Sequence, residues 1–240
     1  MQTHRKPGFC RSGIACLMAV FLLLTTWRAG AAELLVVGGA YVYRLSNGYN
    51  QEIRAQLRYE VASVDAAGVT LQMKPDHPNG GVRRTEVVNR EGNFLRRALD
   101  SHGAWTEYEF ATPYPAYVFP LDTGKSWSLR VHAKVPGLAK ARSVRVDGRV
   151  LGRERIRVPA GDFDTVKIQR FVYPGDVGLG PEETRISELE WYAPALGRFV
   201  RIEKKSGWLD KNRCMEDYDC NFYGDWDVLE LVEVSAGRRY

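Results

Sequence analysis

The feature that most constrains this chain is a strict alternation of apolar and polar residues in several segments. In EIRAQLRYEV, residues 52–61, an apolar residue stands at every second position. Side chains along a β-strand point alternately to opposite faces, so this period places one set in a core and the other in water. The period recurs over residues 69–73 and 127–135. It indicates antiparallel strands with one solvated face.

Further strands are predicted over residues 39–45, 81–89, 143–158, 165–173, 184–191, 198–205 and 226–234, whereas residues 90–101 fit either a strand or a short helix. Because no second long segment has a helical period, an α/β nucleotide-binding sheet is hard to build. A twisted sheet of this many strands has to close, split or be covered. We therefore predict an all-β fold, a curved antiparallel sheet that forms an incomplete or closed barrel with little helix.

The first 31 residues have the order of a secretory signal. Arg5, Lys6 and Arg11 precede an apolar run over residues 14–27, and small residues follow up to Ala31. The run is shorter than the roughly 20 apolar residues that span a bilayer, which disfavours an uncleaved anchor. We predict cleavage after Ala31, leaving one β domain over residues 32–240 in the periplasm or outside the cell.

Removing the signal changes what the charge implies. Of the 34 lysines and arginines, the signal holds four and no acidic residue, so 30 remain against 29 acidic residues. A nucleic-acid partner loses its main support. Of the 4 cysteines, Cys214 and Cys220 remain in an oxidising compartment, and we predict that they form a disulfide.

The cysteines stand in an acidic segment, RCMEDYDCNFYGDWD, residues 213–227. Asp217, Asp219 and Asn221 have the alternating spacing of calcium ligands, but the glycine and glutamate that an EF-type loop requires are replaced by Phe222 and Val228. A disulfide-pinned surface loop is the favoured interpretation, and no metal site is predicted.

A basic segment runs from Lys134 to Arg157, with eight lysines and arginines against Asp147 and Glu154. If the strand is regular, four of the arginines share one face: Arg149, Arg153, Arg155 and Arg157. A solvated face that guards a sheet edge is the common use of such charges. The functional alternative is attraction to anionic lipid head groups, lipopolysaccharide or an acidic partner. The acidic segment could instead neutralise these charges within the fold.

Aromatic residues gather between prolines in TPYPAYVFPLDTGKSW, residues 112–127. The prolines forbid a central strand and favour an extended crossing or rim segment. The aromatics either plug one end of a barrel or line the mouth of an apolar pocket. The candidate ligand-binding residues are Tyr114, Tyr117, Phe119, Trp127 and Trp191.

The sequence gives little support for catalysis. It has no Gly-x-Ser-x-Gly elbow, no His-Glu-x-x-His helix and no phosphate loop. His77, His102 and His132 are expected at the surface. Glu188 and Glu190 share a strand face and could do acid-base chemistry, but a solvated face is the favoured interpretation. We predict no catalytic residue and no cofactor.

The stretch RVPAGDFDTVKIQR, residues 157–170, joins two alternating segments. Proline fixes φ at the second position of a type I turn, and glycine takes the left-handed bulge conformation. Pro159, Gly161 and Asp162 are therefore expected to form a hairpin turn, with Asp162 capping backbone donors.

Three segments together resemble the TapB-like group of exported bacterial proteins of unknown function: YVFPLDTGKSWSL (117–129), GRERIRVPAGDFDTVKI (152–168) and ELEWYAPALGRFVRIE (188–203). That group is similar in architecture to periplasmic lipoprotein-carrier proteins. The resemblance implies a half-barrel around an apolar cavity and carries over no catalytic residue. The segment 206–225 is an addition to the pattern.

The leading hypothesis is a periplasmic binding or chaperone-like module that holds an apolar ligand, such as an acyl chain or a hydrophobic segment of an envelope protein. One alternative is a structural or assembly protein of the envelope that binds partners through charged surfaces. A hydrolase that uses carboxylates is the least favoured.

Overall fold

The computed structural model of this chain describes residues 35–76, 83–101, 104–175, 182–210 and 221–237. In these ranges the regular structure consists of strands alone: β1 (Ala40–Asn47), β2 (Ile53–Val64), β3 (Val69–Asp76), β4 (Arg84–Val88), β5 (Phe94–Ser101), β6 (Ala104–Tyr114), β7 (Ser126–Lys134), β8 (Arg142–Val158), β9 (Gly161–Tyr173), β10 (Glu182–Ala193), β11 (Arg198–Asp210) and β12 (Asn221–Ser235). None of the described residues belongs to a helix long and apolar enough to cross a membrane.

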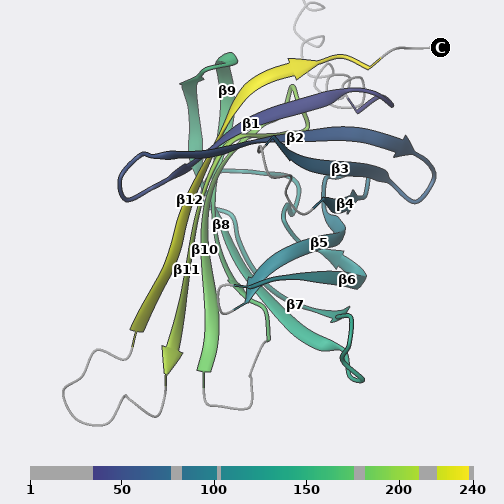
Figure 1. Cartoon of the computed structure of the whole chain (residues 1–240), viewed down its shortest axis with the longest axis vertical. Coiled ribbons are helices and arrows are strands. Elements are labelled where there is room, and N and C mark those ends of the chain that lie inside the picture. Colours follow the sequence, from purple (N-terminus) through teal and green to yellow (C-terminus); the bar gives the residue numbers. More distant parts are fainter. Residues whose placement is uncertain (1–34, 77–82, 102–103, 176–181, 211–220, 238–240) are drawn as a thin grey trace, which may run out of the picture.

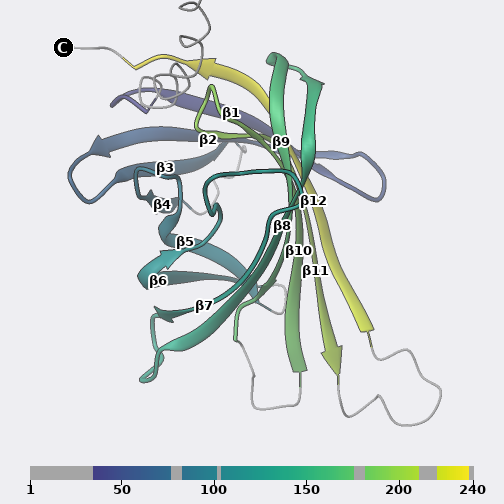
Figure 2. The ribbon, with the colours of Figure 1, turned by 180° about the vertical axis from the view of Figure 1, so that it is seen from behind.

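The strands form a closed antiparallel barrel. Each strand pairs with the next along the chain, and β1 pairs with β12 to complete the ring. In Figure 1 the long strands β8 to β12 form one wall, and β2 to β7 curl away from it; Figure 2 shows the same arrangement from behind. The all-β prediction is confirmed, and of its two alternatives the barrel is the closed one.

Most of the predicted strands are present in the structure. The ambiguous residues 90–101 contain β5, a strand. The strand β6 is absent from the prediction, although Tyr108 and Phe110 alternate there with Glu107 and Glu109. Tyr108 and Phe110 are buried, so the period of two is genuine and was available in the sequence.

The core consists of two clusters of buried apolar side chains. One comes from β5 to β10 and includes Tyr108, Val146 and Ile168. The other comes mainly from β1 to β3 and β10 to β12, with Tyr43 and Leu231 fully buried. Buried arginines contact the aromatic rings of both clusters, so the interior is polar as well as apolar.

The four arginines of β8 were expected to share one face if the strand is regular, and the strand is not regular. Arg149 lies opposite Gln169, whereas Arg153 lies opposite Val166, because the register between β8 and β9 shifts after Val150. Gln169 and Val166 are three positions apart and therefore point to opposite faces. The β-bulge inserts one extra residue, which turns the later arginines away from the face of Arg149.

Candidate functional site

A row of alternating charges crosses four neighbouring strands. Arg170 on β9 lies opposite Glu188 on β10, Glu188 lies opposite Lys204 on β11, and Lys204 lies opposite Asp227 on β12. Residues paired across a sheet point to the same face, so these four side chains form one band. Arg170 and Glu188 are each 1% exposed, which places this part of the band inside the barrel.

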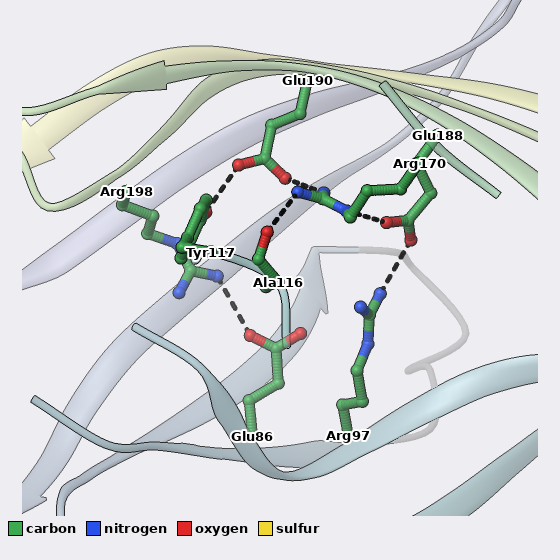
Figure 3. Close-up of polar contacts among 8 residues, drawn as sticks. All are labelled: Glu86, Arg97, Ala116, Tyr117, Arg170, Glu188, Glu190 and Arg198. Carbon is green, nitrogen blue, oxygen red and sulfur yellow. Dashed lines mark hydrogen bonds and ion pairs between the residues drawn. The ribbon is translucent and has the colours of Figure 1, made fainter. Parts of the chain in front are cut away.

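Arg170 is the centre of a buried hydrogen-bond network (Figure 3). Its Nε donates to Oε2 of Glu188 over 2.9 Å, and its NH1 group donates to the carbonyl oxygen of Ala116 over 3.1 Å. Its NH2 group donates to Glu190. A buried charge is tolerated only when it is paired and hydrogen-bonded, and Arg170 meets both conditions.

The carboxylates of this network have further partners. NH2 of Arg97 donates to Oε1 of Glu188 over 3.0 Å, and the Tyr117 hydroxyl donates to Oε1 of Glu190 over 2.5 Å (Figure 3). Both oxygens of each carboxylate are thus occupied, and two arginines balance two glutamates.

The prediction that Glu188 and Glu190 form a solvated face is wrong. Their side chains are 1% and 3% exposed. A period of two shows which residues share a face but not which face meets water, and here the charged phase of β10 points inward. The partner Arg97 is 91 positions from Glu188, so the contact that makes burial possible is invisible in the local sequence.

The electrostatics of this network do not suit acid-base chemistry. Burial by itself raises the pKa of Glu188, but the charges of Arg97 and Arg170 outweigh burial and hold that pKa well below its ordinary range. A general acid requires the opposite shift. Burial and the Glu190 carboxylate raise the pKa of Tyr117 well above its ordinary value, so its hydroxyl stays a donor.

Arg198 forms a second buried group on the other side of the interior. It donates from NH2 to Glu86 over 3.1 Å and from Nε to the Tyr43 hydroxyl over 3.1 Å. Its guanidinium carbon lies 4.6 Å from the ring centre of Tyr59 and 5.1 Å from that of Phe199. These contacts combine ion pairing with cation–π attraction.

Beside these groups lies a cavity of about 360 Å³. Part of its wall is apolar and comes from distant strands, with Leu45, Leu57, Tyr59, Met73 and Leu229 among the lining residues. A smaller hollow of about 20 Å³ shares residues with this wall and reaches Arg97 and Glu188. The cavity therefore adjoins the buried charge network.

The cavity wall also carries charges of both signs. Arg54 lies 3.2 Å from Asp225 and 2.8 Å from Asp227, so it is paired with both aspartates. Lys204 and Arg84 line the same cavity. Burial lowers the pKa of Lys204, and the charge of Arg97 lowers it further.

The predicted ligand-binding aromatics lie elsewhere. None of the five lines the cavity of 360 Å³. Tyr114, Tyr117 and Trp127 belong to the core cluster of β5 to β10. Phe119 is 44% exposed. Trp191 belongs to the other cluster, where its indole nitrogen donates to Glu154 and Lys167 lies over its ring.

The proline-rich segment after β6 fills the interior. Ala116 and Leu121 are buried, and the side-chain amide of Asn93 binds both the N–H and the carbonyl of Tyr117, over 2.7 and 3.0 Å. The Trp127 indole nitrogen donates to the carbonyl of Pro115 over 3.2 Å. The segment is thus held by several contacts, as expected if its aromatic residues plug the barrel instead of lining the mouth of a pocket.

The predicted turn lies at the tip of a hairpin. β8 ends at Val158 and β9 begins at Gly161, with Pro159 and Ala160 between them. Gly161 has a φ of 132°. The Asp162 carboxylate lies 3.6 Å from Arg157.

The remaining predictions concern the cysteines, the histidines and a metal site. Cys214 and Cys220 lie outside the described residues, as do His77 and His102. His132 is exposed. No three His, Cys, Asp or Glu side chains are grouped to hold a metal ion in the part of the chain that the structure describes.

Comparisons with known proteins find similarity in structure alone. No family model matches the chain, so the likeness to the TapB-like group stays a resemblance, and no curated protein matches it. A candidate lipoprotein from Parabacteroides distasonis is 16% identical, with a TM-score of 0.48 over 84% of this chain and 96% of its own. A candidate exported protein with a YmcC-like fold from Bacteroides fragilis is 14% identical, with a TM-score of 0.39 over 83% and 96%. The hypothetical lipoprotein YmcC from Escherichia coli is 11% identical, with a TM-score of 0.41 over 86% and 89%. By their names, these similar proteins are exported proteins or lipoproteins.

Proposed function

We propose that this chain is an exported binding protein whose barrel holds an apolar ligand, or the apolar part of a ligand, in its interior. The observation that carries the proposal is the cavity of about 360 Å³, whose wall is partly apolar and is made by strands far apart in the sequence. Small-molecule sites are concave, largely apolar and about 300–1000 Å³ in volume. The cavity is at the lower end of this range, which suits one small ligand or one chain.

Export to the periplasm rests on the N-terminal signal pattern. The test is to express the full chain in a host with its own signal peptidase and to sequence the N-terminus of the purified protein. We expect Ala32 as the first residue. A protein that keeps residues 1–31 would contradict the periplasmic part of the proposal.

Ligand binding is tested with the neutral fluorescent probe Nile red, whose emission increases in an apolar site. Ala98 lines the cavity, so Ala98→Trp fills it with a large ring and should abolish the increase. Ala62 is exposed on β2, so Ala62→Trp is the matched control and should bind like the parent protein. Native mass spectrometry of the protein as purified should show a bound small molecule.

If the parent protein carries no ligand and does not bind Nile red, the binding function is wrong. If Ala98→Trp and Ala62→Trp reduce binding equally, the probe binds outside the cavity, and the function assigned to the cavity is wrong.

A further inference from the structure

Two cations line the cavity without an ion pair or a hydrogen bond in the described part of the chain, and carboxylates such as Glu86 act on both only at longer range. Lys204 and Arg84 make no hydrogen bond to a described residue, and no described carboxylate lies within 4.0 Å of either. The other charges of the same wall are satisfied: Arg54 is paired with two aspartates, and Glu86 is paired with Arg198.

The partners of the neighbouring carboxylates explain why Lys204 has no ion pair among the described residues. Its direct neighbours on both sides are acidic, Glu188 on β10 and Asp227 on β12. Both oxygens of Glu188 already accept from Arg97 and Arg170. Asp227 is already bound by Arg54. Bidentate and charge-assisted bonds to guanidinium are strong, so these carboxylates have better partners than an ammonium group.

The charges of the cavity and its adjoining network do not balance among the described residues. Six cationic side chains stand against five carboxylates; the cations are Arg54, Arg84, Arg97, Arg170, Arg198 and Lys204, and the carboxylates are Glu86, Glu188, Glu190, Asp225 and Asp227. Taking a charge out of water without a partner is costly, and Lys204 and Arg84 are both partly buried, so the one unmatched positive charge favours an anion as its partner.

Arg84 adds a second donor beside an apolar strip. In the sheet it lies opposite Met73, and Met73 lies opposite Tyr59. Its guanidinium carbon lies 4.2 Å from the ring centre of Trp105, which leaves its N–H groups free to donate at the edge of the plane. A donor thus stands at the end of a row of apolar side chains.

Resting on the proposed binding function, we propose that the ligand is an amphiphile with one anionic head group. The head group is a carboxylate or a phosphate whose oxygens accept hydrogen bonds from Lys204 and Arg84. The chain of the amphiphile lies against Leu57, Met73 and Leu229. A purely apolar ligand would leave both cations without an ion pair.

The test compares probes of equal chain length below their micelle concentrations, by displacement of Nile red. Dodecanoate carries a carboxylate, dodecyl phosphate a phosphate, dodecanol no charge and dodecyltrimethylammonium a positive charge. We expect at least one anion to displace Nile red at about one-tenth of the dodecanol concentration or less. A tenfold difference corresponds to about 1.4 kcal/mol of binding free energy. The tighter anion separates a fatty-acid source from a phospholipid-like source. This series uses the parent protein and needs no variant to fold.

Variants then assign the preference to residues. Lys204→Met and Arg84→Met should each weaken anion binding about tenfold or more and leave dodecanol unchanged. Lys205 is exposed and lies 3.5 Å over the ring of Trp226, and Arg83 is exposed, so Lys205→Met and Arg83→Met are the matched controls.

The outcomes are distinguishable. If dodecanol and the anions displace Nile red equally, the anionic head group is wrong while the binding function stands. If dodecyltrimethylammonium is preferred, the acidic residues select the ligand and the proposal is likewise overturned. If neither Nile red nor any of the probes binds, it is the proposed function that fails.

Discussion

Replacement of Arg170 by methionine is the sharpest test of the buried charge network. Arg170 donates to Glu188, to Glu190 and to the carbonyl of Ala116, and it is 1% exposed. The variant Arg170→Met keeps a long, unbranched side chain but removes all of these bonds. Two buried carboxylates then share the single cation of Arg97.

The size of the effect follows from this imbalance. Removing one partner of a buried ion pair costs about 3–5 kcal/mol, because the remaining charge is left uncompensated. Domains unfold with about 5–15 kcal/mol, so this loss is a large share of the total stability. Adding Glu190→Gln to Arg170→Met restores one cation for one carboxylate, and the new amide oxygen can still accept from Tyr117. The double variant should therefore recover at least about 1 kcal/mol relative to Arg170→Met.

The assay is equilibrium unfolding in urea, followed by tryptophan fluorescence and by circular dichroism. Arg149 is exposed on β8, so Arg149→Met is the control and should stay within about 0.5 kcal/mol of the parent protein. If Arg170→Met lowers the free energy of unfolding by less than about 1 kcal/mol, the two buried carboxylates do not depend on the charge of Arg170. If Glu190→Gln gives no recovery, charge imbalance is not the cause of the loss.

Three further predictions concern other parts of the fold. Burial raises the pKa of several tyrosines, to about 12 in Tyr192. The stability that their neutral forms provide is therefore complete below pH 10.0 and is lost as the pH rises toward the pKa values of the folded protein. Phenolate absorbance should rise cooperatively with unfolding instead of gradually. A Cβ at Gly148 would lie 2.1 Å from the Trp127 ring, so Gly148→Ala should lower the free energy of unfolding by about 1–3 kcal/mol. A Cβ at Gly152 would meet nothing within 4 Å, so Gly152→Ala is the control and should not lower it. Equal losses of the two variants in urea unfolding would refute the packing argument. Cys214 and Cys220 should be joined in protein from an oxidising compartment, and non-reducing peptide mapping that finds both thiols free would reject this.

The sequence predicts the fold class because its strongest signal is local. The alternation in β2 is readable within ten residues, and each such strand restricts the architecture independently. Closure of the barrel depends on the pairing of β1 with β12, for example Tyr43 with Leu231. These residues are almost the whole domain apart, and no local period reports whether the first and last strands meet.

The candidate site was less predictable, because it also depends on contacts between residues that are far apart in the sequence. Periodicity places Glu188 and Glu190 on one face, but the arginines that allow their burial come from β5 and β9. The cavity wall draws on strands from both ends of the chain, so no single segment contains a motif for it. The aromatic segment 112–127 did stand out in the sequence, and in the structure its Ala116 and Tyr117 contact the network directly.

The network and the cavity are best understood together. A buried ion pair is weak support for stability, since well-packed apolar side chains of similar volume often do as well or better. The consequence that apolar residues could not reproduce is electrostatic: Arg97 and Arg170 each donate to one oxygen of Glu188 and offset its charge, so Glu188 attracts the neighbouring Lys204 less than an unpaired carboxylate would. Lys204 therefore remains available to an anion at the cavity wall. An anionic head group would gain a charge-assisted hydrogen bond there that a neutral head group cannot match, and this is the physical reason to expect head-group selection at Lys204.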